Sequence, residues 1–141
     1  MVHEIFSQEK ITKLKERYPN AKLLAHPECE DVVLKMADYI GSTTGILKYA
    51  TNSPVTEFIV ATEPGIIHQM QKENPDKVFI PAPPNNQCAC NDCPHMKRNT
   101  LEKLYLCLKN EMPEITVPQH IIAKAVKPIE RMLEISARLG L

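Results

Sequence analysis

Three cysteines, Cys88, Cys90 and Cys93, lie close together in a proline-rich segment. Clustered thiols are typical of a metal site, a redox pair or an iron–sulfur cluster. The pattern Cys90-x-x-Cys93 is not placed at a predicted helix start, where thioredoxin-like pairs lie. A zinc site could use the three thiols and His95, although structural zinc sites usually take two ligands from each of two segments. An iron–sulfur cluster normally takes four cysteines, and fewer thiolates leave an iron open to act as a Lewis acid.

The length and composition indicate one domain without a diffuse electrostatic partner. The chain has 141 residues, with 17 basic and 17 acidic side chains. This charge balance argues against nucleic acid or a membrane surface as a partner, and no apolar run approaches the ~20 residues of a membrane span. The first residues lack the layout of a signal peptide, so we expect a cytoplasmic protein with reduced thiols. Five cysteines, an odd number, favour ligands or redox chemistry over a disulfide framework.

Helices and strands are predicted to alternate in the first part of the chain, which favours an α/β fold with a parallel sheet. The expected helices cover residues 7–17, 28–39, 42–50 and 63–73, and the expected strands cover 22–26, 57–62 and 77–80. After the cysteine loop, helices are expected at 100–110 and at 121–139, the latter kinked or restarted at Pro128. An internal repeat supports this pattern. Residues 15–25 and 72–80 both read as a helix end, a Pro-Asn or Pro-Asp turn, a lysine and an apolar strand.

Polar residues follow the predicted strands, at the edge where parallel α/β folds bind ligands. The first strand ends in His26-Pro27-Glu28, which offers an imidazole and a carboxylate on a stiff turn for general acid–base work. Glu28 could instead simply begin a helix. Ser42 and Thr43 could bind a carboxylate or phosphate at a helix start, although a plain N-cap is commoner. Thr62-Glu63 could also serve a ligand, but here the structural interpretation, ordinary polar residues before Pro64, is favoured.

The remaining cysteines and histidines carry weaker signals. Cys29 and Cys107 fall in predicted helices and are interpreted as ordinary buried thiols. His3, His68 and His120 would by default be surface or core histidines.

Taken together and in order, these motifs resemble quinolinate synthase of the bacterial and archaeal type. The similarity extends over essentially the whole chain. Its matching elements are Val2-His3-Glu4, Tyr18-Pro19-Asn20-Ala21, His26-Pro27-Glu28-Cys29, Ala37-Asp38, Gly41-Ser42-Thr43, Ala61-Thr62-Glu63-Pro64-Gly65, Cys90-Asn91-Asp92-Cys93-Pro94, Met96, Asn99-Thr100-Leu101 and the stretch 128–133.

The resemblance implies a transferase of NAD biosynthesis. Such enzymes condense iminosuccinate (iminoaspartate) with dihydroxyacetone phosphate to form quinolinate. They use a 4Fe–4S cluster that only three cysteines hold, so that one iron stays open to substrate. By this resemblance Cys93 is a cluster ligand, and Cys88 and Cys90 are accessory and form a possible redox pair.

The same resemblance assigns roles to the strand-end residues. Glu28 is expected to transfer protons, and His26, with Pro27 beside it, to orient the bound acid. Ser42 and Thr43 match residues that hold a carboxylate of iminosuccinate. His3 matches a histidine that lines the same cavity.

Family members are roughly twice as long, with three similar α/β/α domains that each contribute one cluster cysteine. The resemblance therefore implies a carboxyl-terminal part. Residues 1–96 are expected to hold the edge of the second domain and the third, three-layer α/β/α domain with its cysteine loop (81–96), and residues 97–141 a helical segment. The missing domains, or a separate chain that supplies them, are the expected partners, and the chain alone is expected to be inactive. The alternative is a non-enzymatic zinc-binding or interaction module built on Cys88, Cys90 and Cys93.

Overall fold

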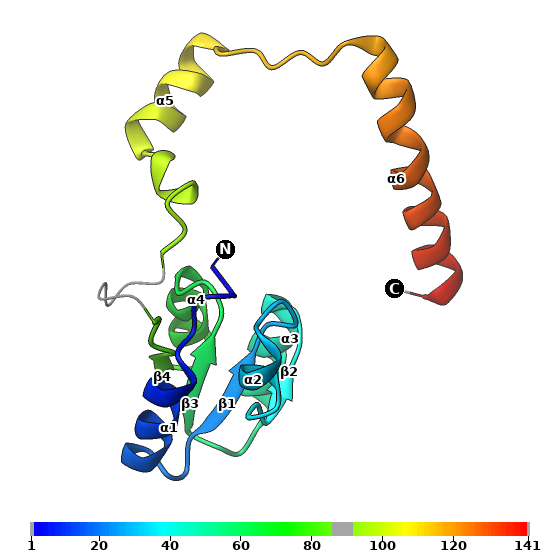
Figure 1. Cartoon of the computed structure of the whole chain (residues 1–141). Coiled ribbons are helices and arrows are strands. Elements are labelled where there is room, and N and C mark those ends of the chain that lie inside the picture. The colour runs from blue at the N-terminus through cyan, green and yellow to red at the C-terminus, as the bar shows by residue number, and fades with distance from the viewer. Residues whose placement is uncertain (1, 86–91, 141) are drawn as a thin grey trace. The chain divides into compact units, whose positions relative to one another are not determined.

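The computed structural model describes residues 2–85 and 92–140 and divides the chain into two compact units, Met1–Arg98 and Asn99–Leu141. The first unit is an α/β structure (Figure 1). Its elements are α1 (Gln8–Arg17), β1 (Lys22–Ala25), α2 (Asp31–Leu34), β2 (Tyr39–Ile40), α3 (Thr43–Asn52), β3 (Glu57–Ala61), α4 (Gly65–Glu73), β4 (Val78–Pro81) and the 3₁₀ turn η1 (Met96–Arg98). The second unit holds α5 (Leu101–Asn110) and α6 (Gln119–Leu139).

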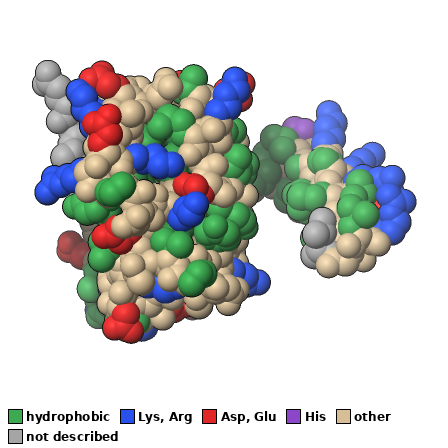
Figure 2. Space-filling model, turned by 90° about the horizontal axis from the view of Figure 1, so that it is seen from below, with side chains coloured by type: hydrophobic (Ala, Val, Ile, Leu, Met, Phe, Trp, Pro, Cys, Tyr) green, Lys and Arg blue, Asp and Glu red, His purple; other side chains and the backbone are tan. Residues whose placement is uncertain are grey.

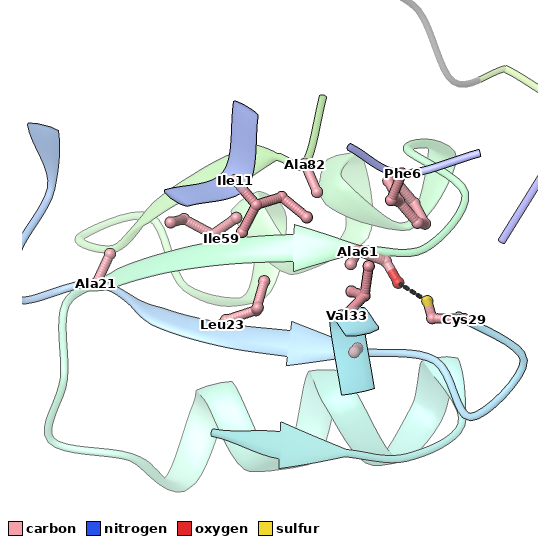
Figure 3. Close-up of a cluster of buried hydrophobic side chains, with 10 residues drawn as sticks. Phe6, Ile11, Ala21, Leu23, Cys29, Val33, Ile59, Ala61 and Ala82 are labelled. Carbon is pink, nitrogen blue, oxygen red and sulfur yellow. Dashed lines mark hydrogen bonds between the residues drawn. The ribbon is translucent and has the colours of Figure 1, made fainter. Parts of the chain in front are cut away.

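The four strands form one parallel sheet in the order β2-β1-β3-β4. Successive side chains of a strand point to opposite faces, and both faces of this sheet are covered. One face packs against α1 and α2 in a core that includes Leu23, Ile59 and Val33 (Figure 3). The other packs against α3 and α4 in a core that includes Phe58 and Ile46. The unit thus has three layers, which confirms the predicted α/β/α fold.

The internal repeat seen in the sequence is a repeated backbone structure. Tyr18 ends α1 with φ −125° and ψ 72°, and Asn74 ends α4 with φ −134° and ψ 71°. In each case the amide N–H of this residue donates to the carbonyl four residues earlier at 2.9 Å. In each case its own carbonyl then accepts from the residue three positions later, Ala21 or Lys77. The same turn therefore delivers the chain twice from a helix into a buried parallel strand.

The helix predicted over residues 28–39 is wrong. Only Asp31–Leu34 is helical, and Tyr39–Ile40 forms the edge strand β2. Pairing with β1 takes the chain out of the helix, because the amide of Asp38 donates to the carbonyl of Leu23 at 2.8 Å. Val33 of α2 is fully buried in the core, whereas Ile40 on the edge strand is 45% exposed. Strand pairing over a long sequence distance has overridden a local helical pattern.

Both carboxylate oxygens of Asp38 accept hydrogen bonds that hold the start of β2 against β1. One oxygen accepts from Lys22 Nζ at 2.9 Å, and the other accepts from the Leu23 amide at 2.8 Å and from Lys15 Nζ at 3.3 Å. Partial burial opposes ionisation of the carboxyl group, but these donors outweigh it and hold the pKa of Asp38 below its ordinary value. The ionised side chain therefore stabilises the fold.

Replacing Asp38 with alanine should lower the free energy of unfolding by about 1–3 kcal/mol at neutral pH, because the Leu23 amide loses its carboxylate partner. The pKa of Asp38 is depressed in the folded state, so its contribution is full above the unfolded pKa of about 3.9. It is lost as the pH falls through the folded pKa. Urea unfolding at pH 7 and at pH 3 measures both effects. A difference between wild type and variant that stays constant between these pH values would contradict the ionic role.

The second unit consists of two amphipathic helices without a core of their own. Thr100, at the predicted start of this helix, caps α5, because its hydroxyl accepts from the Lys103 amide at 3.2 Å. α6 runs without interruption through Pro128, so the predicted restart there is wrong. No described residue of either helix is buried. On α6, apolar side chains lie beside basic ones (Figure 2). Cys107 on α5 is exposed, so its predicted burial is also wrong.

Among the residues that the structure describes, no helix has both the length and the apolar character needed to cross a membrane.

Candidate functional site

The candidate site lies where β1 and β3 end. Ala25 and Ala61 are paired in the parallel register, so the residues that follow them, His26 and Thr62, emerge at the same edge of the sheet. The amide of His26 donates to the carbonyl of Ala61 at 3.1 Å and extends the strand pairing by one step. This edge is the one at which parallel α/β folds place their ligands.

The N-terminal segment brings His3 to this edge. Figure 1 shows the N-terminal segment at the end toward which the arrows of β1 and β3 point. Buried Phe6 anchors the segment in the core. The amide of Ser7 donates to the carbonyl of Pro83 at 3.0 Å, and the amide of Asn85 donates to the carbonyl of Ile5 at 2.6 Å. The segment is thus hydrogen-bonded to the chain that follows β4.

Both ring nitrogens of His3 have partners. Nδ1 lies 2.9 Å from Oε2 of Glu28, and Nε2 lies 3.1 Å from Oγ1 of Thr62. An ionised carboxylate only accepts hydrogen bonds, so Nδ1 of His3 is the donor. In the neutral ring Nε2 then accepts from the Thr62 hydroxyl. Because Thr62 is only 2% exposed, a fixed buried group sets the orientation of the His3 ring.

His26 stacks on His3, with ring centroids 4.1 Å apart and an interplanar angle of 11°. Its Nδ1 accepts from the backbone amide of Glu28 at 3.3 Å, which leaves the proton of the neutral ring on Nε2. Burial, and secondarily the positive charge that His3 can carry, lower the pKa of His26, while Glu28 works in the opposite direction. At neutral pH His26 therefore offers an uncharged N–H donor at the site.

Glu28 is the most exposed member of this group. Its side chain is 72% exposed, and Oε2 lies 2.9 Å from Nδ1 of His3 and 3.8 Å from Nδ1 of His26. The residue lies in a turn closed by a 3.0 Å hydrogen bond from the Cys29 amide to the His26 carbonyl. Glu28 does not begin a helix, since α2 starts at Asp31 with Glu30 as its N-cap. The carboxylate faces the two imidazoles.

Cys29 belongs to the core beneath the site. It lies in the turn before α2, not in a helix as predicted, although its predicted burial is confirmed. Its Sγ–H donates to the carbonyl of Ala61 at 3.3 Å (Figure 3). Burial raises the pKa of the Cys29 thiol to about 11. The thiol therefore stays protonated at neutral pH and is a poor metal ligand.

Alkylation can test whether the Cys29 thiol is buried and protonated. In the folded chain at pH 8, Cys29 should react with iodoacetamide more than ~100-fold slower than exposed Cys107, because only the thiolate is nucleophilic. Mass spectrometry of peptides after timed quenching measures both rates. In denaturant the two rates should converge. Equal rates in the folded chain would contradict the buried, protonated thiol.

Ser42 and Thr43 lie at the start of α3, after β2. The Ser42 hydroxyl accepts from the Gly45 amide at 3.2 Å, so this side chain is an N-cap, as the plainer interpretation expected. Tyr39 packs close by, because a Cβ on Gly45 would lie 2.9 Å from its hydroxyl. Within the described part of the chain, no hydrogen bond joins Ser42 or Thr43 to the two histidines or to Glu28. Their role as carboxylate ligands stays a prediction.

Sequence reasoning did not predict the role of Thr62. Its position at the end of a predicted strand was recognised, but its contact with His3, 59 residues away, depends on the sheet. The Glu63 carboxylate beside it accepts from the amide of Gly65, the first residue of α4, at 2.7 Å, which agrees with the structural interpretation of this pair.

Cys88 and Cys90 lie outside the described residues, so the predicted redox pair and the alternative zinc site remain predictions. Cys93 is partly buried, and its carbonyl accepts from the Lys97 amide at 3.1 Å in the η1 turn. Within the described residues, the one group of three side chains suited to a metal ion consists of His3, His26 and Glu28. Of the described cysteines in the α/β unit, Cys29 is engaged in the core and only Cys93 can supply a thiolate. These residues do not complete a site for an iron–sulfur cluster.

Comparison with known proteins identifies the family. Residues 1–134 match the model of the family described as quinolinate synthetase A protein. The chain belongs to this family. It is 63% identical to the quinolinate synthase of Gloeothece citriformis over 136 residues, which cover 96% of this chain and 42% of the relative. The quinolinate synthases of Microcystis aeruginosa and Nostoc punctiforme are 61% and 62% identical over the same share of the chain.

The family resemblance drawn from the motifs is thereby confirmed. The chain spans less than half the length of these quinolinate synthases. Residues 3, 26, 28 and 62 all fall inside the region that matches the family.

Proposed function

We propose that the chain is the carboxyl-terminal part of a cytoplasmic quinolinate synthase, a transferase that condenses iminosuccinate with dihydroxyacetone phosphate to quinolinate in NAD biosynthesis. The observation that carries this proposal is the identity of about 60% to proteins named quinolinate synthase along 96% of the chain. The position of His3, His26 and Glu28 at the ligand-binding edge of the sheet supports it.

In this proposal Glu28 is the group that moves protons. Its exposed carboxylate can reach a substrate, while the Nδ1–H of His3 keeps it aimed at the site when no substrate is bound. Condensation to an aromatic ring requires several proton transfers, and a positioned carboxylate can catalyse them. His3 is then a positioning residue whose own orientation depends on Thr62.

His26 serves as a neutral donor. With Nδ1 held by the Glu28 amide, its Nε2–H can donate to a carboxylate or carbonyl oxygen of the acid substrate without adding a full charge. The first amides of a helix have no partner within the helix, so the start of α3, at Ser42 and Thr43, suits a second carboxylate. Pro27 stiffens the turn between His26 and Glu28.

The proposal includes a 4Fe–4S cluster with Cys93 as one ligand and the other ligands in polypeptide that the chain does not contain. When bound, the cluster would supply a Lewis-acidic iron. Cys88 and Cys90 are proposed as a redox pair beside it. We assign residues 1–96 to the edge of one domain and a complete third α/β domain, and 97–141 to the helical segment. The isolated chain should therefore be inactive.

A chimera tests the function. The 136-residue region of this chain that aligns with the Gloeothece citriformis quinolinate synthase replaces the matching region of that enzyme. The chimera and the parent enzyme are purified without oxygen and assayed for quinolinate. The chimera should form quinolinate within about tenfold of the parent, since most of the region is identical. A folded chimera that carries the cluster but forms no quinolinate would overturn the proposal. Quinolinate formation by the isolated chain would overturn the claim that it is incomplete.

A further inference from the structure

We propose that the apolar faces of α5 and α6 dock on the part of a quinolinate synthase that this chain does not contain. The inference rests on the proposed function. It adds to that function the surface through which the chain joins the rest of the enzyme, and this surface lies outside the candidate site and the cysteine loop.

The apolar face of α5 consists of Leu101, Leu104, Tyr105 and Leu108. This spacing places the four side chains on one side of the helix, and they are between 55% and 83% exposed. α5 has only 10 residues. Helices shorter than ~12–15 residues are marginal in water, and in proteins most of their stability comes from packing of an amphipathic face. The helix therefore needs a partner for this face.

α6 carries a longer apolar face, at Ile122, Val126, Ile129, Met132 and Leu133. These residues recur at intervals of three or four, so their side chains lie on one side of the helix. Ile129, Met132 and Leu133 are 52–59% exposed. The charged residues of the helix lie on its other side, which is the pattern of a helix that packs one face against a protein and turns the other to water.

The α/β unit does not offer a matching surface. Both faces of its sheet are already covered by its own helices. Among its described residues, the exposed large apolar side chains are those of Val32, Ile40, Val78 and Met96. They belong to four different elements, α2, β2, β4 and η1, and single exposed apolar residues of this kind are ordinary. The partner of the two helix faces therefore comes from outside this chain.

The lengths of the relatives indicate which partner this is. The matched region covers 42% of the Gloeothece citriformis enzyme, so more than half of that polypeptide has no counterpart in this chain. The family match runs to residue 134 and includes the apolar face of α6. A full-length relative therefore has, in the same molecule, further polypeptide that can bury this face.

A second copy of this chain fits the surface less well. α6 carries four basic side chains and two acidic ones. Pairing two copies of the helix would bring like charges together beside the apolar faces, and like charges at short distance repel. We therefore assign the surface to the missing part of the enzyme.

Thermal unfolding of the chimera and of the whole isolated chain tests this assignment. Ile129→Gln combined with Met132→Gln should lower the Tm of the chimera by at least about 5 °C, because two amides would be buried in an apolar interface. The same pair should change the Tm of the isolated chain by less than about 1 °C, since both side chains are exposed there.

Lys124→Gln combined with Lys127→Gln is the matched control. It introduces the same residue at the same spacing, on the charged side of α6, and should leave the Tm of both proteins within about 1 °C. Leu104→Gln combined with Leu108→Gln should lower the Tm of the chimera as the α6 pair does. Amide hydrogen exchange gives a second measurement, because the amides of α6 should exchange at least about 100-fold more slowly in the chimera than in the isolated chain.

Three outcomes would overturn the docking proposal. The first is a chimera whose Tm the Ile129 and Met132 substitutions leave unchanged. The second is a monomeric isolated chain that they destabilise as much as the chimera, which would place the partner surface within this chain. The third is a dimer of either protein, seen by sedimentation, that they dissociate, which would make the partner a second copy.

The two proposals fail in different ways. A chimera that forms quinolinate but loses no stability through these substitutions would refute the docking surface and leave the function standing. A folded, cluster-containing chimera that loses stability as expected but forms no quinolinate would refute the function and leave the docking surface standing.

Discussion

Truncation of Phe58 to alanine should lower the free energy of unfolding of the α/β unit by about 3–5 kcal/mol. Phe58 lies on β3 and is fully buried in the core between the sheet and helices α3 and α4. Its ring stacks on that of Phe79 of β4 with centroids 5.6 Å apart, and the Lys77 ammonium lies 5.8 Å from its centroid. Alanine would remove these contacts and leave a cavity that the strands of the sheet cannot close.

Urea unfolding followed by circular dichroism measures this loss. Phe58→Leu keeps most of the volume and should cost less than about 1.5 kcal/mol. Val78→Ala, on the edge strand β4 where the side chain is 49% exposed, should cost less than about 1 kcal/mol. If Phe58→Ala were no more destabilising than Val78→Ala, the described core would be wrong.

Glu28→Gln in the chimeric enzyme should reduce kcat for quinolinate formation by about 10²–10⁴-fold, the usual contribution of a general acid–base group. The amide keeps the size of the side chain but cannot take up a proton. Because Glu28 is largely exposed, the variant should keep the thermal stability of the parent. The loss should therefore appear in kcat at unchanged protein stability.

Glu30→Gln is the matched control. Glu30 is an exposed glutamate two residues away, and its side chain makes no capping hydrogen bond at the start of α2. The Glu30→Gln enzyme should keep kcat within about twofold of that of the chimera without the substitution. A Glu28→Gln enzyme as active as the Glu30→Gln enzyme would contradict the assignment of proton transfer to Glu28. His3→Ala should lower kcat less than Glu28→Gln, since His3 acts through the position of the carboxylate.

The sequence alone determined the features that depend on short-range contacts. Ser7, Ser42 and Thr100 stand at the starts of predicted helices, and each hydroxyl accepts from the amide three residues later. Such a bond forms within one turn of helix and needs no partner from elsewhere in the chain. The repeated helix-to-strand turn and the family were also readable from the sequence, because both are carried by residue order.

Only the tertiary structure decided the edge strand and the site. Residues 28–39 have a helical pattern, yet the Asp38 amide and carboxylate pair with Leu23 and lead the chain into β2. His3, Glu28 and Thr62 meet only because β1 and β3 are adjacent and in register. A hydrogen bond across 59 residues depends on the order of the strands, which no local pattern of residues specifies. For the same reason the sequence named Glu28 and His26 as candidates but could not predict that Thr62 orients His3.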